Sequence, residues 1–199
     1  RLTAEDVGFR LGPRLNACGR LGHAGEAAAL LTTEDRAAAV RIAASLTGVN
    51  ERRRAEQRAI TEEAEARAID AGMTGDERLA IVLADEGWHP GVIGIVCSRL
   101  VDRFRRPTVL LRRENGVCRG SCRSVEGLNI HDALAACAEH LETFGGHAMA
   151  AGLRLSSDRL DAFTDACMEH VGSRITPDDL RPTLSIDCDA TLGEMTPEE

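Results

Sequence analysis

The feature that most constrains the fold is an alternation of strand-like and helix-like segments between residues 79 and 171. The run Leu79-Ala80-Ile81-Val82-Leu83-Ala84 is continuously apolar, as expected of a strand buried on both faces. Asn115-Gly116 is a hairpin signal between two further strand-like runs. The expected elements are a strand at 79–84, a helix at 91–103, strands at 107–111 and from 117, a helix at 130–141, a strand at 150–155 and a helix from Ser156 or Ser157 to about 171. This βαββαβα order predicts a small α/β domain with a mixed sheet.

A long helical pattern precedes this domain. Between Thr33 and Gly72 the one helix breaker is Gly48, so the sequence predicts a helix over residues 34–71. That helix would be about 57 Å long at about 1.5 Å per residue. Its second half is charged on nearly every face, which is typical of a helix that connects domains. Two shorter helices that meet at Gly48 are the alternative, because glycine weakens a helix interior.

The two ends of the chain differ from its middle. Residues 1–33 are rich in glycine and are interrupted by Pro13, which predicts the irregular tail of a preceding domain. Residues 176–179 predict a linker, and the alternation over 183–190 predicts the start of a β (OB-like) domain. Because the chain opens on Arg1 rather than Met, we expect a piece of a longer protein. The predicted organisation is a tail at 1–33, a connecting helix at 34–72, an α/β domain at 76–175, and a linker with the start of a β domain at 176–199.

The charge and the cysteines narrow the class of protein. A net charge of −8 argues against a non-specific nucleic-acid binder, yet residues 99–123 hold eight arginines and two acidic residues. The close pair Cys118 and Cys122 lacks a second Cys or His pair at zinc-ligand spacing. Free thiols in a reducing cytoplasm are therefore expected. No apolar stretch reaches the roughly 18 residues of a membrane span, so we expect no membrane partner.

The first segment suited to phosphate is Trp88-His89-Pro90-Gly91-Val92-Ile93-Gly94. It follows a strand and opens a helix, at the sheet edge where open α/β folds bind ligands. Its glycines permit close backbone approach, and its helix N-terminus presents free N–H groups to an anion. The alternative is a Pro-Gly turn in which Trp88 and His89 only pack.

Two further segments carry polar side chains in a specific pattern. In Arg119-Gly120-Ser121-Cys122-Arg123-Ser124, Ser121 and Arg123 point the same way on a strand, and a hydroxyl beside a planar guanidinium forms a phosphate grip. The alternative is an exposed polar strand face. In Phe144-Gly145-Gly146-His147-Ala148-Met149, the two glycines predict a curled backbone whose N–H groups form an anion-binding nest. A lone histidine is more often structural, but one flanked by glycines and small residues is a more specific signal.

These segments together resemble the DHH phosphoesterase superfamily, and within it the RecJ family of single-stranded-DNA exonucleases. The resemblance covers about residues 8–175 and is carried by Gly12-Pro13-Arg14-Leu15-Asn16-Ala17-Cys18-Gly19-Arg20-Leu21, by residues 88–95 with Ser98-Arg99-Leu100, by residues 120–124 with Asn129-Ile130-His131-Asp132-Ala133-Leu134, and by residues 145–152, which resemble the signature of the DHH-associated domain. One departure is Cys122, where that family more often has glycine. A cysteine there is expected to stiffen the strand and to narrow the groove.

The resemblance implies a 5′-to-3′ exonuclease of DNA repair and recombination, in which Mn²⁺ or Mg²⁺ ions activate water. The metal ligands of that family lie upstream, in a domain with an Asp-His-His motif that this sequence lacks. The chain is therefore expected to hold single-stranded DNA, to bind no metal itself and to be inactive alone. The implied protein partners are a single-stranded-DNA-binding protein and a helicase.

The resemblance also assigns roles by position. Ser121 and Arg123 would grip a terminal phosphate. His147, the candidate catalytic residue, would contact the scissile or a neighbouring phosphate together with the amides of Gly145 and Gly146. The remaining candidates are Arg14, Asn16 and Arg20, which would line the cleft from the catalytic side, and His89, which would bind phosphate. With aromatic residues at 3%, a sequence-independent phosphate grip fits better than base stacking.

Two other functions remain open. One is a phosphodiesterase of the same superfamily that degrades oligonucleotides or cyclic dinucleotides; the long helix and the start of a further β domain count against it. The other is a non-catalytic nucleic-acid-binding module, like the DHH-associated domain of alanyl-tRNA synthetases or a degenerate replication-scaffold relative. An Asp-His-His region upstream would favour the enzyme.

Overall fold

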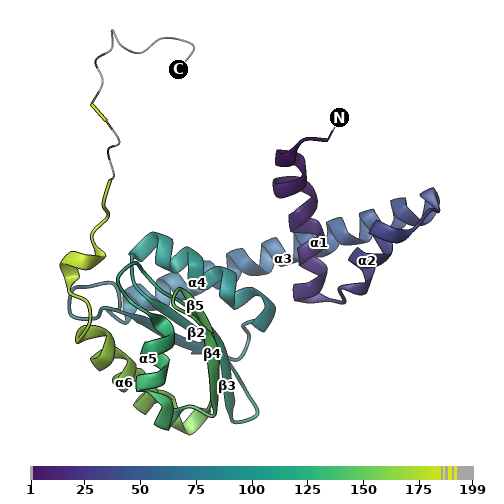
Figure 1. Ribbon diagram of the computed structural model, residues 1–199. Coiled ribbons are helices and arrows are strands. Elements are labelled where there is room, and N and C mark those ends of the chain that lie inside the picture. Colours follow the sequence, from purple (N-terminus) through teal and green to yellow (C-terminus); the bar gives the residue numbers. More distant parts are fainter. Residues whose placement is uncertain (1, 185, 187, 190, 192–199) are drawn as a thin grey trace.

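The computed structural model describes residues 2–184, 186, 188, 189 and 191, and shows a mixed α/β fold (Figure 1). Its five-stranded sheet has the order β1-β2-β3-β5-β4, with β1 parallel to β2 and the other neighbours antiparallel. The strands are β1 (Ile81–Asp85), β2 (Thr108–Glu114), β3 (Val117–Arg123), β4 (Thr143–His147) and β5 (Ala150–Ser156). The mixed sheet is therefore confirmed.

Strand β4 is absent from the predicted elements. The sequence predicts a curled, anion-binding backbone at Gly145-Gly146-His147. These residues instead pair in register with β5, so that prediction is wrong. Gly146 has φ +147°, and a Cβ added there would meet the Ala150 carbonyl oxygen at 2.5 Å. Glycine is thus needed at this position for close strand approach, while its poor strand propensity hides the strand from sequence patterns.

Helices cover the two faces of the sheet differently (Figure 1). On β1, Ile81 and Leu83 pack toward α4 (Pro90–Phe104) and the end of α3 (Arg36–Asp70), whereas Val82 points into the core on the opposite face. That second core lies under α5 (Ile130–Ala136) and α6 (Leu160–Gly172). The predicted helix at 130–141 is shorter than expected, because a separate 3-10 turn follows at Ala138–His140.

Helix α3 is one unbroken helix of 35 residues, so the alternative of two helices meeting at Gly48 is wrong. The Asp35 side chain caps it by accepting from the Ala37 N–H. Its C-terminal part is tied to the sheet domain, because Glu63 accepts a hydrogen bond from the indole N–H of Trp88 at 3.0 Å. Arg67 adds an ion pair with Asp85 at 2.9 Å.

The predicted irregular tail at the N-terminus is also wrong. Asp6–Leu11 form a π-helical turn, followed by α1 (Gly12–Leu21) and α2 (Gly25–Thr32), which pack against α3. Pro13 sits in the first turn of α1, where its missing N–H costs no helical hydrogen bond.

At the other end of the chain, the predicted linker contains a 3-10 turn, Pro177–Leu180, capped by Thr176. The β domain expected from residue 183 lies partly outside the described residues, at 185, 187, 190 and 192–199. Within the part of the chain that is described, none of the helices is long and apolar enough to cross a membrane.

Candidate nucleic-acid interface

Ser121 and Arg123 lie side by side on β3, against the first turns of α4. A Cβ added at Gly94 would be 3.3 Å from Ser121 Oγ and 3.4 Å from a terminal nitrogen of Arg123. The Cys97 thiol donates to the Ser121 carbonyl oxygen at 3.2 Å and so holds α4 on this strand. Arg123 donates one hydrogen bond to the carbonyl oxygen of Cys122 at 2.7 Å. Both side chains are half-buried beside a glycine.

The sheet register brings His147 to the same face as this pair. Arg123 lies opposite Ala150, and Ala150 lies opposite His147, so the three residues form one row across β3, β5 and β4. Directly opposite residues of neighbouring strands point to one face of the sheet. The Cα atoms of Arg123 and His147 are therefore about 10 Å apart, two strand spacings of about 4.8 Å each. His147 is exposed, and the alanine between them leaves the surface open.

Ser121 belongs to a second row on this face. It lies opposite Gly152, which in turn lies opposite Gly145. Because both glycines lack side chains, the sheet surface beside Ser121 is flat. Two predicted phosphate-binding side chains and the exposed histidine thus share one open surface.

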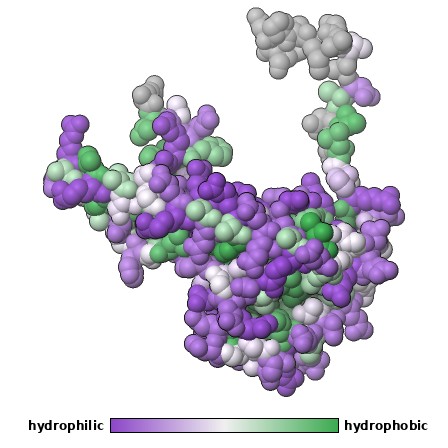
Figure 2. Space-filling view, turned by 180° about the vertical axis from the view of Figure 1, so that it is seen from behind, coloured by the Kyte–Doolittle hydropathy of each residue, from purple (hydrophilic) through white to green (hydrophobic). Residues whose placement is uncertain are grey.

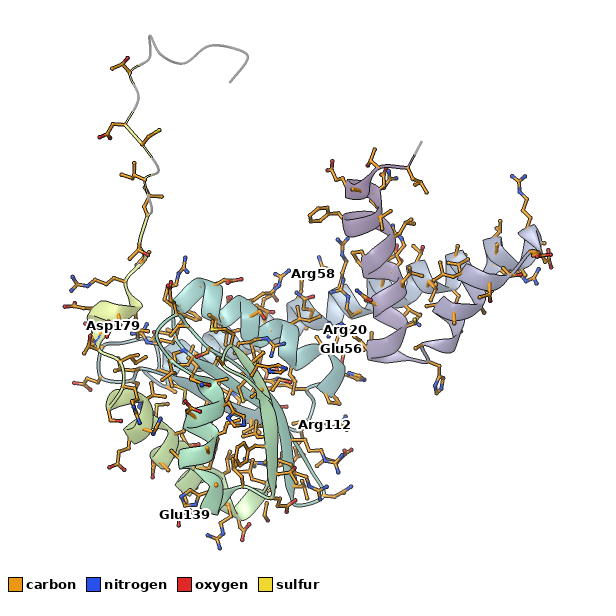
Figure 3. The ribbon with its side chains drawn as sticks, in the orientation of Figure 1. Arg20, Glu56, Arg58, Arg112, Glu139 and Asp179 are labelled. Carbon is orange, nitrogen blue, oxygen red and sulfur yellow. The ribbon has the colours of Figure 1, made fainter. Side chains whose placement is uncertain are left out.

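Helix α1 contacts the N-terminal end of α4 at the edge of this surface. Arg20 donates to the carbonyl oxygen of Gly91 at 3.0 Å, and a Cβ added at Gly91 would meet the Arg20 carbonyl oxygen at 2.2 Å. Only glycine allows this approach. Asn16 is exposed one helical turn before Arg20, on the same side of α1. In Figure 3, Arg20 lies above Arg112 on the side of the sheet domain that faces α1.

The N-terminus of α4 is already occupied by the chain itself. His89 Nδ1 accepts from the Gly91 N–H at 3.1 Å, and the His89 carbonyl oxygen accepts from the N–H groups of Val92 and Ile93 at 2.9 and 3.2 Å. The expectation of free N–H groups for an anion is therefore wrong at these positions. Trp88 is buried and serves packing. A phosphate-binding role for His89 remains a prediction.

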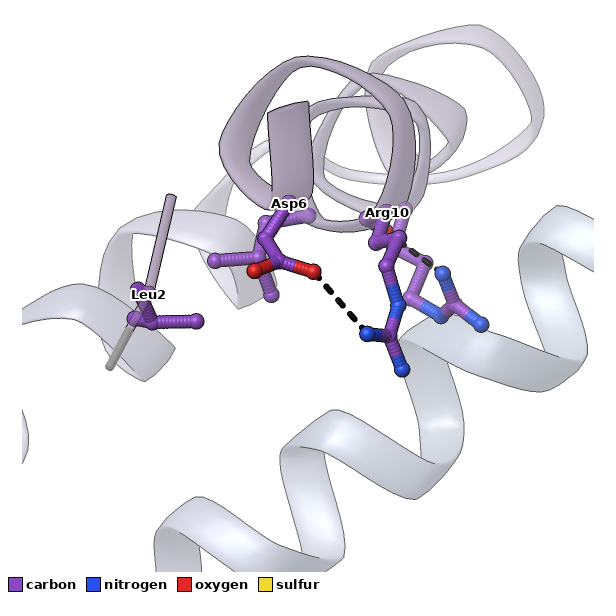
Figure 4. A pocket seen from close by; sticks show the side chains of 5 residues that line it. Leu2, Asp6 and Arg10 are labelled. Carbon is purple, nitrogen blue, oxygen red and sulfur yellow. Dashed lines mark hydrogen bonds and ion pairs between the residues drawn. The ribbon is translucent and has the colours of Figure 1, made fainter. Parts of the chain in front are cut away.

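Arg14 lies apart from the other candidates. Its Nε donates to Thr47 Oγ1 of α3 at 3.4 Å. It lines a hollow of about 230 Å³ together with Leu2, Asp6 and Arg10, where Asp6 pairs with Arg10 at 2.9 Å (Figure 4). The structure thus gathers Ser121, Arg123 and His147 on one face with Arg20 at its edge, and leaves Arg14 on α1 against α3.

A basic hollow between α3 and α4 is not among the predicted site residues. It measures about 540 Å³ and is lined by Glu51, Arg53, Arg54, Gln57, Arg58 and Arg99. Burial lowers the pKa of the Arg53 guanidinium, and the positive charges of Arg54, Arg20 and Arg99 lower it further. The arginines that line the hollow come from α3 and α4, so sequence spacing gives no sign that they meet.

The other predicted features concern Cys122 and a metal. Cys122 is buried in the core under α5 and α6, on the opposite face from Ser121 and Arg123, so it does not narrow the groove. Within the described residues, no three His, Cys, Asp or Glu side chains gather in a way that could hold a metal ion. The described residues therefore do not fit a metal centre.

Comparison with known proteins shows which proteins the chain is similar to. The family model for the DHHA1 domain matches residues 76–172. The chain is 38% identical over 196 residues to the single-stranded-DNA-specific exonuclease RecJ of Bacillus subtilis, covering 98% of this chain and 25% of that protein. It is 35% identical over 208 residues to the Escherichia coli protein of the same name, covering 100% of this chain and 35% of that protein.

Solved structures agree with the sequence matches. The crystal structure of RecJ from Thermus thermophilus in complex with Mg²⁺ superposes with a TM-score of 0.79 at 34% identity, over 88% of this chain and 27% of that one. An exonuclease RecJ bound to manganese gives a TM-score of 0.79 at 34% identity, over 91% of this chain and 44% of that one. The chain spans about a quarter to a third of the length of the curated relatives it matches. It contains a DHHA1 domain and is homologous, over nearly its whole length, to part of the RecJ proteins.

Proposed function

We propose that this chain is the DNA-holding part of a metal-dependent 5′-to-3′ single-stranded-DNA exonuclease. One observation carries the proposal: Ser121 and Arg123 lie beside Gly94, on the open sheet face that they share with His147. A hydroxyl and a guanidinium that lie against the same glycine offer several donors to one phosphate group. The names of the relatives, which are single-stranded-DNA-specific exonucleases, support the substrate class.

The catalytic metal belongs, in this proposal, to residues outside this chain. The related structures contain Mg²⁺ or Mn²⁺, which supports a divalent metal in the whole enzyme. His147, together with the backbone of Gly145 and Gly146, would then contact the phosphate nearest to the metals. We expect this chain alone to show no manganese-dependent nuclease activity, and a purified sample that degrades single-stranded DNA would overturn this division of labour.

The proposal extends to organisation and partners. Residues 1–33 carry exposed Leu2, Val7, Phe9 and Leu31, which supports their packing against a preceding domain in the whole protein. Residues 34–72 would then connect that domain to the DNA-holding domain at 76–175, with a β domain beginning in 176–199. A cytoplasmic location is supported by the free thiols among the described residues, and single-stranded-DNA-binding protein and a helicase are the proposed partners.

The proposal is tested by Arg123→Ala. Fluorescence anisotropy should show a loss of affinity for 5′-phosphorylated single-stranded oligonucleotides of about tenfold, because one charged phosphate contact is lost. The slope of log affinity against log salt should fall by about 0.7 for that contact. The matched control is Arg113→Ala, since Arg113 is exposed on the opposite face of the neighbouring strand β2. Equal affinities for the two variants would refute the proposed site.

A further inference from the structure

A row of three arginines crosses the same sheet face, beyond Ser121. Arg112 on β2 lies opposite Arg119 on β3, and Arg119 lies opposite Arg154 on β5. Arg119 shares the face of Ser121 and Arg123, because residues two apart on a strand point the same way. Like charges directly opposite one another destabilise a sheet. An arrangement of this kind indicates a surface that receives an anion.

The charge of this row is only partly neutralised. Arg112 pairs with Glu114 at 2.7 Å, and Arg154 pairs with Glu142 at 2.5 Å. Arg119 has no ion pair or side-chain hydrogen bond among the described residues, and its side chain is exposed. The Nε–H group of Arg112 is buried without an acceptor in the described part of the chain. The excess positive charge is therefore centred on Arg119, with an unused donor beside it.

Hollows lie on both sides of Arg119. One, of about 310 Å³, is lined by Pro90, Arg112, Glu114, Asn115, Val117 and Arg119. The other, of about 450 Å³, is lined by Arg119, Thr143, Phe144, Gly145, Gly152, Leu153 and Arg154. The glycines of the second hollow are the two that lie in the row of Ser121. A nucleic-acid strand bound on this face would thus meet a flat surface beside Ser121 and Arg119.

We propose that Arg119, flanked by Arg112 and Arg154, binds a second nucleotide phosphate on this face. Along β3 it is about 6.6 Å from Ser121, two residues at about 3.3 Å each. A planar guanidinium presents two parallel donors to the oxygens of a phosphate. The inference rests on the proposed function and deepens it, because it gives the bound DNA a direction along β3. The phosphate belongs either to the same DNA strand or to a free nucleoside monophosphate.

The test compares Arg119→Gln with Arg113→Gln, which removes an arginine from the opposite face of the sheet. Affinity is measured by anisotropy or calorimetry for thymidine monophosphate, a short 5′-phosphorylated oligothymidylate and a longer one, over a salt series. Arg119→Gln should weaken binding of the longer oligonucleotide about tenfold and lower the salt slope by about 0.7, the value for one single-strand phosphate contact. Arg113→Gln should leave both quantities unchanged.

The ligand series separates the two sources of phosphate. Weaker binding of oligonucleotides with unchanged binding of the monophosphate assigns the subsite to the strand. Weaker binding of the monophosphate as well assigns it to a free nucleotide. If Arg119→Gln behaves like Arg113→Gln while Arg123→Gln still weakens binding, the second subsite is wrong and the proposed function stands. If the unsubstituted chain binds none of these ligands, both are wrong. Thermal unfolding of each variant confirms that the fold is retained.

Discussion

At the scale of single residues, glycine decides how closely the parts of this surface approach. Gly91 lets the Arg20 carbonyl oxygen reach the start of α4, and Gly94 lets Ser121 and Arg123 lie against the same helix. Gly146 lets β4 pair closely with β5. By contrast, an added Cβ at Gly145 would have no atom within 4 Å. Two adjacent glycines of one motif therefore have different roles.

This difference predicts the outcome of two alanine substitutions. Gly146→Ala should lower the free energy of unfolding by about 1–3 kcal/mol or more, because its φ of +147° is unfavourable for alanine and the Cβ would overlap β5. Gly145→Ala should change it by less than about 1 kcal/mol, since the space is open. Urea unfolding of both variants makes the comparison. Similar losses at the two positions would contradict the proposed distinction.

At the scale of elements, α3 is stabilised by its neighbours rather than by its own sequence. The middle of α3 is largely exposed and highly charged. In its C-terminal half, Ile60, Ala64 and Ala68 are buried against the sheet domain, and in its N-terminal half Leu46 is buried. Packing at both ends keeps the helix continuous through Gly48, where local propensity favours a break.

Gly48→Ala should therefore stabilise the chain. The new Cβ would meet only the end of the Arg52 side chain, at 3.8 Å, and alanine costs less conformational entropy than glycine. The expected gain in the free energy of unfolding is about 0.5–1 kcal/mol, measured by urea unfolding. Gly48→Pro, which removes a helical hydrogen bond, should instead cost about 3 kcal/mol. A neutral result for proline would indicate two separate helices.

At the scale of the whole molecule, the buried cysteines make the free energy of unfolding depend on pH in the alkaline range. Burial raises the pKa of Cys97 and of Cys167 from 9.0 to about 12, and that of Cys137 to about 11. Burial also raises the pKa of Cys122. In each case the folded state favours the neutral thiol, whereas the unfolded chain ionises near the ordinary value. Their contribution to stability is therefore complete below about pH 9 and is lost as pH rises toward 12.

We expect the free energy of unfolding to be level near neutral pH and to fall above about pH 9, by about 1.4 kcal/mol per pH unit for each such thiol. Guanidinium unfolding at a series of alkaline pH values measures this slope. When Cys97 and Cys167 are both replaced by alanine, the slope of the free energy of unfolding against pH should be smaller by the contribution of about two thiols. An unchanged slope in that double variant would show that other groups cause the decline.

The exposed apolar side chains of the N-terminal helices also belong to this scale. Viewed from behind in Figure 2, hydrophobic side chains are interspersed among hydrophilic ones over the N-terminal helices. Phe9 is 77% exposed and Leu31 is 71% exposed, whereas Phe163 of the sheet domain is fully buried. The sheet domain thus has a closed core of its own, and the N-terminal helices present apolar side chains at their surface.

The sequence by itself determined the mixed sheet, the continuous helical run before it and the placement of Ser121 and Arg123 on one side of a strand. Each of these follows from local information: apolar runs of strand length, helical spacing, and the alternation that sets Ser121 and Arg123 on one side of a strand. The elements that it missed, β4 and the N-terminal helices, contain glycine or proline, whose local preference is overridden by partners distant in sequence.

The tertiary structure alone decided which side chains meet. Residues 119, 123, 147 and 154 share one face because β5 lies between β3 and β4, an order that no local pattern specifies. The same holds for His89, whose capping bonds occupy the helix N-terminus, and for Arg20, which reaches α4 from 71 residues away. Strand order and helix docking are set by burying apolar surface across the whole chain, so they can be read only from the folded molecule.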